Sequence, residues 1–288
     1  MSINLAALGV RWDAGTVRWG SKDALLYAVG VGAGAADPSA ELQFTTENSR
    51  GVDQVVLPTF LVTLRGNRTE GMPALGDFGN DRILHAEQAI ELPGLIPVTG
   101  SARVGSVVSR ILDKGKHALI EIESELRDTE TDALVGTGRS MLHVRDAGGF
   151  GGDRGESAQW SLPDREPDHT LTATTRPEQA LLYRLTGDRN PLHSDPTFAA
   201  RASFDRPILH GLCTYGFAGR MLTEQVLGGD ARRFRGMSVR FASPVWPGDV
   251  LTVRAWENGD EEVLFVVSVG DRVVLDRGRL TTVAEGSA

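Results

Sequence analysis

The chain has 288 residues, 41% of them hydrophobic and 24% charged, and 30 Lys and Arg against 38 Asp and Glu give a net charge of −8. These proportions exclude wholesale disorder and are typical of a soluble globular protein. The acidic balance argues against nucleic acid as a partner, and no apolar run approaches the roughly 20 residues that span a bilayer, so no membrane partner is expected. The start of the chain does not resemble a signal peptide, and we expect a cytoplasmic protein of about two domains.

A short apolar pattern occurs twice. Residues 23–30 read DALLYAVG, and residues 179–187 read QALLYRLTG. The first copy is followed by three β-rich runs, predicted as strands at about 98–112, 116–127 and 133–145. The segment 146–170 is rich in Gly, Pro, Asp and Ser and too polar for a core, which predicts a linker between 1–145 and 171–288.

The second half repeats this order of elements with a clearer helix. A short helix is predicted to begin near Pro177, and a long one is predicted over about 211–227, where apolar residues recur at helical spacing. Strands are expected at about 235–243, 249–257, 262–269 and 272–283. The sequence therefore predicts an α+β fold in which a sheet wraps round one long helix twice, each half being large enough for its own core.

The segment that carries chemistry lies after the second apolar copy, where Asp188, Asn190 and His193 follow Gly187 and surround Pro191. Proline excludes a regular helix here, so a tight turn could direct the carboxylate and the imidazole at one water. Gly-Asp-x-Asn-Pro is equally typical of an ordinary turn. Calcium fits poorly, since the sixth and twelfth loop positions would be His193 and Ala199, and no zinc-binding spacing is present.

A second element is His210-Gly211, at the expected start of the long helix. The N–H groups at a helix start can stabilise a carbonyl oxygen that gains negative charge, and glycine allows a substrate to come close. The alternative is a glycine that only packs the helix against the sheet. Cys213, the only cysteine, is expected to be a small core residue, and it excludes an internal disulfide.

The stretch from Tyr183 to His193, followed by His210-Gly211, resembles the signature of the MaoC-like (R)-specific 2-enoyl-CoA hydratases, the hydratase 2 class. The resemblance covers nearly the whole chain. It implies a double hot-dog fold and a homodimer. It also implies that Asp188 and His193 hold a catalytic water, with Asn190 in the same turn, and that the Gly211 N–H forms an oxyanion hole. Further matches imply acyl and coenzyme A contacts from His85, Ala86, Lys114 and Phe241, with Ala86 departing from a glycine that is common in the family. Arg189 and Arg240 are further candidate cations for the coenzyme A phosphates.

These residues lead to a functional hypothesis: reversible syn hydration of trans-2-enoyl-CoA to (3R)-hydroxyacyl-CoA in fatty-acid or sterol side-chain metabolism. The first half retains no Asp, Asn or His at the matching positions 29–34, so it is expected to form a wall for the acyl chain. No metal or redox cofactor is expected, because coenzyme A belongs to the substrate. Alternatives are a (3R)-hydroxyacyl dehydratase acting on acyl carrier protein, a hot-dog thioesterase, which the acid–base motif disfavours, and a non-catalytic acyl-CoA-binding or assembly protein.

Overall fold

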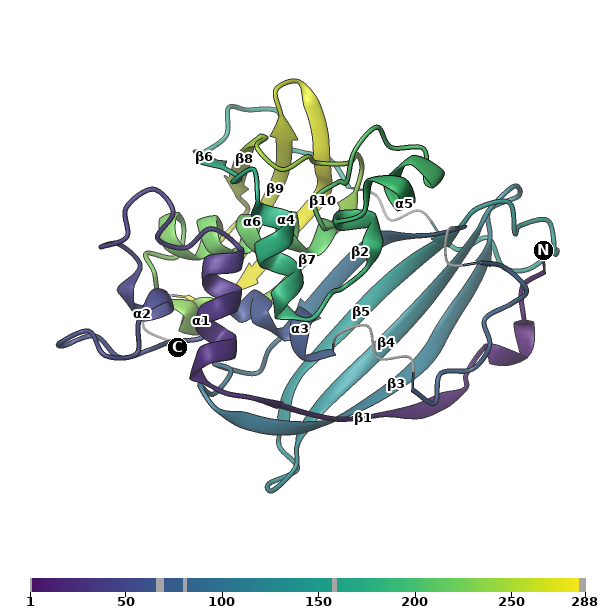
Figure 1. Cartoon of the computed structure of the whole chain (residues 1–288), viewed down its shortest axis with the longest axis horizontal. Helices are drawn as coiled ribbons and strands as arrows, with labels where there is room; N and C mark the ends of the chain where they lie inside the picture. Colours follow the sequence, from purple (N-terminus) through teal and green to yellow (C-terminus); the bar gives the residue numbers. More distant parts are fainter. Residues whose placement is uncertain (1, 66–69, 80–81, 157–159, 285–288) are drawn as a thin grey trace.

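The computed structural model describes residues 2–65, 70–79, 82–156 and 160–284. Their strands form one antiparallel sheet (Figure 1). The first half contributes β1 (Arg11–Trp19), β2 (Ile83–Glu91), β3 (Gly100–Asp113), β4 (Ala118–Asp128) and β5 (Leu134–Val144). The second half contributes β6 (His169–Thr174), β7 (Phe234–Phe241), β8 (Val250–Glu257), β9 (Glu262–Val269) and β10 (Arg272–Thr282). The seven strands predicted from the sequence are present within two residues of their expected ends, and β1, β2 and β6 are additional.

The strand order shows that the two halves are repeats. The sheet runs β1-β3-β4-β5-β2-β7-β10-β9-β8-β6, so the order from each outer edge to the centre is the same in both halves. The repeats meet where β2 pairs with β7, in a register that places Glu87 opposite Arg240 and Glu91 opposite Gly236. This arrangement confirms the double hot-dog fold class that the sequence implied.

The two copies of the apolar pattern lie against each other. They form α1 (Ser21–Gly30) and α4 (Gln179–Tyr183), which stand side by side in Figure 1. The rings of Tyr27 and Tyr183 are 6.2 Å apart, and the Gln179 side chain donates a hydrogen bond of 2.7 Å to the Gly30 carbonyl. The sequence repeat therefore marks the contact between the halves at their centre.

The long helix was expected twice, and for the first half this expectation is wrong within the described residues. The second half has α6 (Gly211–Gln225), whereas the first half has no described helix longer than the ten residues of α1. The shorter helices are α4, α2 (Leu42–Thr45), α5 (Pro196–Arg201) and α3 (Leu61–Arg65), which follows the 3₁₀ turn Pro58–Phe60. None of them meets the length and hydropathy needed to cross a membrane, and neither does α1 or α6.

The reason for this asymmetry is that α6 serves both halves. A Cβ on Gly216 would lie 2.5 Å from the Val31 side chain, and a Cβ on Gly219 would lie 2.4 Å from that of Thr59. Segments of the first half thus pack directly on the α6 backbone. The main hydrophobic core accordingly draws on both halves, although each half is long enough for a core of its own. A smaller cluster around Val108 and Ile120 belongs to the first half alone.

The predicted linker contains no helix or strand in its described residues up to Asp168, and its last two residues belong to β6. Its start is held to the β3–β4 hairpin by Asp113, whose carboxylate accepts hydrogen bonds from the N–H groups of Gly115, Gly149 and Gly151 at 2.7 to 2.9 Å. These bonds, first of all the one from Gly149, lower the pKa of Asp113. The linker is thus anchored at its beginning.

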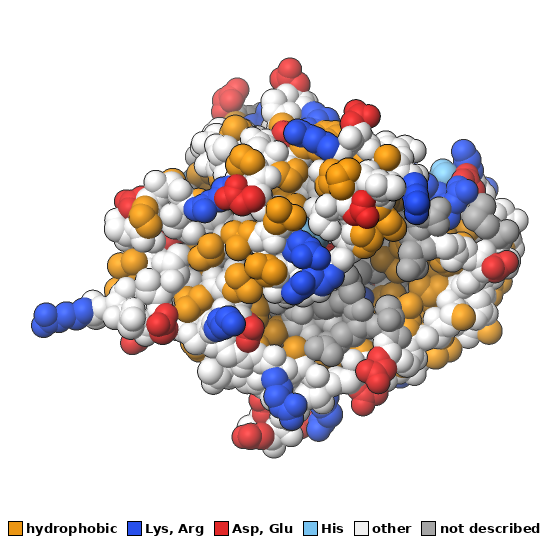
Figure 2. Space-filling model, in the orientation of Figure 1, with side chains coloured by type: hydrophobic (Ala, Val, Ile, Leu, Met, Phe, Trp, Pro, Cys, Tyr) orange, Lys and Arg blue, Asp and Glu red, His pale blue; other side chains and the backbone are white. Residues whose placement is uncertain are grey.

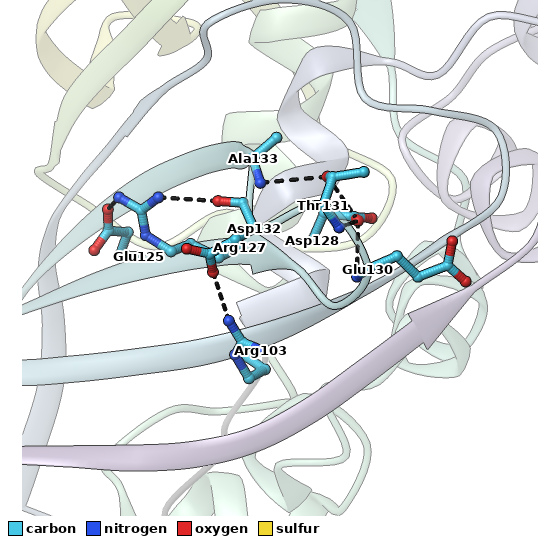
Figure 3. A network of polar contacts seen from close by, with 8 residues as sticks. All are labelled: Arg103, Glu125, Arg127, Asp128, Glu130, Thr131, Asp132 and Ala133. Carbon is cyan, nitrogen blue, oxygen red and sulfur yellow. Dashed lines mark hydrogen bonds and ion pairs between the residues drawn. The ribbon is translucent and has the colours of Figure 1, made fainter.

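The neighbouring β4–β5 hairpin is closed by a polar network (Figure 3). The Asp128 carboxylate accepts hydrogen bonds from the N–H groups of Glu130 and Thr131, and Arg103 pairs with Asp132 at 2.5 Å. Asp132 adopts a left-handed φ of 59°, which an aspartate tolerates better than most side chains. Local side-chain bonds therefore fix this turn at the protein surface.

Candidate active site

The sequence left open whether residues 187–193 form an ordinary turn or one that directs Asp188 and His193 at one point, and the structure fits both. Gly187 has a φ of 133°, which favours glycine. The Asp188 carboxylate accepts a hydrogen bond from the Asn190 N–H at 3.1 Å, and the Asn190 side chain accepts one from the Leu192 N–H at 3.0 Å. Asn190 thereby caps the 3₁₀ turn Pro191–His193, and the ordinary turn chemistry is what brings Asp188 and His193 together.

His193 is buried and held in one tautomer. Its Nδ1 lies 2.9 Å from the carbonyl oxygen of Ile208. Because a carbonyl only accepts, Nδ1 must carry the proton, which leaves a lone pair on Nε2 of the neutral ring. Burial lowers the pKa of His193, against the opposing effects of the Ile208 hydrogen bond and the Asp188 charge. A neutral ring whose Nε2 can take a proton is what a general base requires.

His210 is a site residue that sequence reasoning did not assign, although it stands beside Gly211 in the motif. Its ring stacks on that of His193 with centroids 3.8 Å apart, and it contacts the ring of Tyr183 on another side. Its Nε2 lies 3.2 Å from the Asp188 carbonyl oxygen and so donates to it. Burial, and then the neighbouring His193, lower the pKa of His210 to about 2, so this ring stays neutral.

These three residues are also a possible metal-ligand group. Within the described parts of the chain, Asp188, His193 and His210 each offer a ligand atom within 4.8 Å of the others. One nitrogen of each ring is already bonded to a backbone carbonyl, which leaves the His193 Nε2 and the His210 Nδ1. The stacked rings place these groups side by side, an arrangement that also suits the holding of a water.

Gly211 begins α6 as the sequence predicted. The first N–H groups of a helix have no acceptor within it, so the Gly211 N–H stands at a position suited to an oxyanion. The Phe241 ring covers this glycine so closely that an added Cβ would lie 3.0 Å from it. Gly211 therefore starts the helix as predicted, and its lack of a side chain allows the close contact with Phe241, which is the packing role that the sequence left open.

The first half reaches this site through β2. A β-bulge lies between His85 and Glu87, so Ala86 is the extra residue and His85 turns toward β7. The rings of His85 and Phe241 are 4.9 Å apart. Phe241 thus stands between His85 and Gly211 and joins the two halves at the site.

Two of the three candidate cations already have partners. The Lys114 ammonium donates to the Arg154 carbonyl, and the Arg240 guanidinium forms a two-point ion pair with Asp276. Arg189 is exposed beside Asp188. Figure 2 shows Lys and Arg side chains scattered among acidic ones on the face of Figure 1, rather than gathered in one patch.

Comparison with known families gives two matches along the chain. Residues 18–146 match the MFE-2 hydratase 2 N-terminal domain, and residues 159–276 match the MaoC like domain. The chain is 42% identical to the 3-hydroxyacyl-thioester dehydratase Y of Mycobacterium tuberculosis, over 99% of this chain and all of that protein. It is 37% identical to the peroxisomal enoyl-CoA hydratase 2 of Arabidopsis thaliana, over 88% of this chain and 86% of that one.

Solved structures give the same result. The MaoC-like dehydratase of Phytophthora capsici superposes with a TM-score of 0.87 at 31% identity and covers 99% of this chain and all of its own. A Mycobacterium tuberculosis protein described as a double hotdog fold gives a TM-score of 0.59 at 17% identity, over 96% of each chain, a likeness of fold alone. The chain belongs to the MaoC-like hydratase and dehydratase family, with an MFE-2 hydratase 2 N-terminal domain followed by a MaoC-like domain.

Proposed function

We propose that this protein is a hydro-lyase that catalyses the reversible (R)-specific hydration of trans-2-enoyl-CoA to (3R)-hydroxyacyl-CoA. The observation that carries the proposal is the convergence of Asp188 and a neutral, anchored His193. The start of α6 at Gly211 supports it. Relatives named enoyl-CoA hydratase 2 and 3-hydroxyacyl-thioester dehydratase support the same chemistry.

The substrate is bound through its thioester. The carbonyl oxygen accepts a hydrogen bond from the Gly211 N–H, which stabilises the negative charge that develops there as the enolate forms. One such donor is typically worth about 3–4 kcal/mol in the transition state. The ring of Phe241 closes one side of this position and excludes water from it.

The water is activated by His193. It is held between Asp188 and the His193 Nε2, which removes a proton while the water oxygen bonds to C3, and the C2–C3 electron pair moves toward the thioester oxygen. The Asp188 charge stabilises the imidazolium that forms. The imidazolium returns the proton to C2 on the same face, which makes the addition syn and restores the neutral ring. Dehydration is the reverse sequence.

Separate Asp188→Asn and His193→Gln variants test this assignment with trans-2-butenoyl-CoA. We expect kcat to fall about 10²- to 10⁴-fold in each, because each loses an acid–base function. His169→Gln, on the surface strand β6, is the matched control and should keep the native rate. A native rate in either site variant contradicts the proposal.

The thioester carrier separates the main alternatives. Rates with matched coenzyme A and acyl carrier protein thioesters distinguish a hydratase from a dehydratase of fatty-acid synthesis. Binding without turnover across several chain lengths would instead indicate a non-catalytic acyl-CoA protein. Release of free thiol would indicate a thioesterase.

Several finer features belong to the same proposal. We infer a homodimer, a cytoplasmic location, and a reaction without metal or redox cofactor, in which Arg189 contributes to the binding of the coenzyme A phosphates. Light scattering after gel filtration tests the dimer. Activity retained after exhaustive chelation tests the reaction without metal, and an increase in KM for Arg189→Gln tests the phosphate contact.

A further inference from the structure

On the core face of the first-half sheet, a short polar layer separates two apolar regions. We call this layer, which begins at Ser106 and Ser124, the polar step. On β3, Ser106 lies between Val104 and Val108, and on β4 the opposite residue Ser124 lies between Ile122 and Leu126. The valines, Ile122 and Leu126 are buried in the two hydrophobic clusters. The two serine hydroxyls are also buried and lie 2.9 Å apart. A wall made only for an aliphatic chain does not require this step.

A positive charge occupies the polar step. Arg65, the last residue of α3, donates from Nε to the Ser124 hydroxyl at 2.8 Å and from Nη1 to the Ser140 hydroxyl at 2.7 Å. Ser140 donates in turn to the side-chain oxygen of Gln88 at 2.8 Å. The polar step therefore consists of one guanidinium, three hydroxyls and one amide.

The guanidinium has no anionic partner in the described part of the chain. It has five N–H donors, and the bonds to Ser124 and Ser140 use two of them. No described carboxylate lies within ion-pair distance, and Nη2 bonds to no described acceptor. Burial lowers the pKa of Arg65 to about 10, which reflects the cost of desolvating a cation beside neutral hydroxyls. Buried guanidinium groups are normally paired with a carboxylate or a phosphate.

His85 links Arg65 to the candidate active site, electrostatically on one side and through its contact with Phe241 on the other. The His85 Nε2 is buried without a partner among the described residues, and burial, followed by the charge of Arg65, lowers the pKa of His85 to about 4. The His85 ring contacts Phe241, and Phe241 covers Gly211. A series of contacts thus leads from Gly211 through Phe241 to His85, and the charge of Arg65 acts on the His85 ring.

We propose that Arg65 is a specificity-determining residue that binds a carboxylate at the far end of the acyl group, so that enoyl thioesters with a terminal carboxylate are preferred over those with a terminal methyl group. This inference rests on the proposed function, because the orientation of the acyl group is set by the thioester at Gly211. A planar guanidinium binds a carboxylate through two parallel hydrogen bonds, and the His85 Nε2, which has no hydrogen-bond partner among the described residues, is a candidate for a third polar contact.

Binding of saturated analogues tests this without turnover. Dissociation constants are measured by calorimetry for hexanedioyl-, octanedioyl- and decanedioyl-CoA, each against the plain acyl-CoA of equal length and against coenzyme A alone. The native protein should bind at least one diacid thioester more tightly than its plain counterpart. Arg65→Met should weaken that binding about ten- to a hundredfold and leave the plain acyl-CoA and coenzyme A unaffected. Arg65→Lys should recover part of the loss, and Arg103→Met, in a surface ion pair, is the matched control.

Three results would overturn the proposal. The first is an equal ratio of diacid to plain acyl-CoA dissociation constants in the native protein and in Arg65→Met, and the second is that the native protein prefers no diacid. The third is an equal weakening of the binding of coenzyme A alone, which would assign Arg65 to a phosphate. Circular dichroism of each variant checks its fold, and the plain acyl-CoA provides an internal reference in case Arg65→Met loosens the core. Turnover of trans-2-octenoyl- and trans-2-octenedioyl-CoA forms a separate arm. Failure of the native protein to hydrate either one contradicts the proposed function, while the binding ratios still decide the role of Arg65.

Discussion

The imidazole rings of His193 and His210 are stacked, with centroids 3.8 Å apart and an interplanar angle of 30°. Each ring is fixed by a backbone carbonyl, that of Ile208 for His193 and that of Asp188 for His210. In the proposed mechanism His210 thus supports the turn that holds the water, since its ring stacks on that of His193 and its Nε2 donates to the Asp188 backbone carbonyl. It acts as a positioning residue.

Replacing His210 by Phe separates these two contacts. Phenylalanine keeps a flat ring against His193 and loses the donor to the Asp188 carbonyl. We expect kcat to fall roughly tenfold, as a small misplacement of a catalytic group costs that much or more, with KM nearly unchanged. Steady-state kinetics and circular dichroism measure this, with His169→Phe as the surface control. An unchanged kcat would show that the Asp188 backbone does not need this bond.

The pH dependence of the hydration rate should follow from the pKa of His193. Because burial lowers its pKa below the ordinary value of 6.5, the ring stays neutral down to a pH below that value. The hydration rate should therefore be level near neutrality and fall only as the pH drops below 6.5. The Asp188 charge raises the pKa of His193, so the residual rate of Asp188→Asn should decline at still lower pH. An acid limb of kcat/KM centred above 6.5 would assign the base to another group.

A methyl group at Gly211 should collide with Phe241. The Cβ of Gly211→Ala would lie 3.0 Å from that ring, closer than carbon atoms normally approach, so either the ring or the start of α6 must move. We expect kcat/KM to fall about 10²-fold through loss of oxyanion stabilisation. The double variant with Phe241→Leu relieves the collision and should recover part of this loss. No recovery would show that the damage lies in the helix start itself.

A largely buried ion pair joins the two halves. Arg220 of α6 bonds to Glu41 at 2.7 Å, and their side chains are only 12% and 11% exposed. Glu41→Gln leaves the guanidinium without its charge partner and should lower the free energy of unfolding by about 3–5 kcal/mol. The exposed pair Arg103–Asp132 is the control, where Asp132→Asn should cost less than about 1 kcal/mol. Urea denaturation measures the unfolding free energy of both variants. Equal losses would show that burial does not strengthen the contribution of the Arg220–Glu41 pair.

The anchor of the linker predicts acid sensitivity. Because its N–H partners, Gly149 first, hold the pKa of Asp113 below 3.8, the carboxylate contributes stability above that pH and loses it as the pH falls through the lowered value. Asp113→Asn should melt at a lower temperature at pH 7 and lose less on acidification to about pH 3 than the native protein does. Parallel melting curves across this range would argue against the anchor.

Much of the fold and part of the site could be predicted because they are local in the chain. The strands follow from short β-rich runs, and seven of them were placed within two residues. The turn at Asp188 and His193 is formed by bonds between residues two apart, so its residue types already encode it. The start of α6 at Gly211 could also be predicted from the sequence. The family resemblance added their chemical roles.

What the sequence determined by itself, then, was the repeated architecture and the turn that contains the proposed acid–base residues, since alternation, turn residues and capping act within a few positions. Only the tertiary structure decided that one helix serves both halves, that His210 supports His193, and that Arg65 meets Ser124 from 59 residues away. It also decided that Lys114 and Arg240 are engaged with other groups. Such contacts depend on how the sheet brings distant segments together, and no local pattern specifies which residues will then face one another.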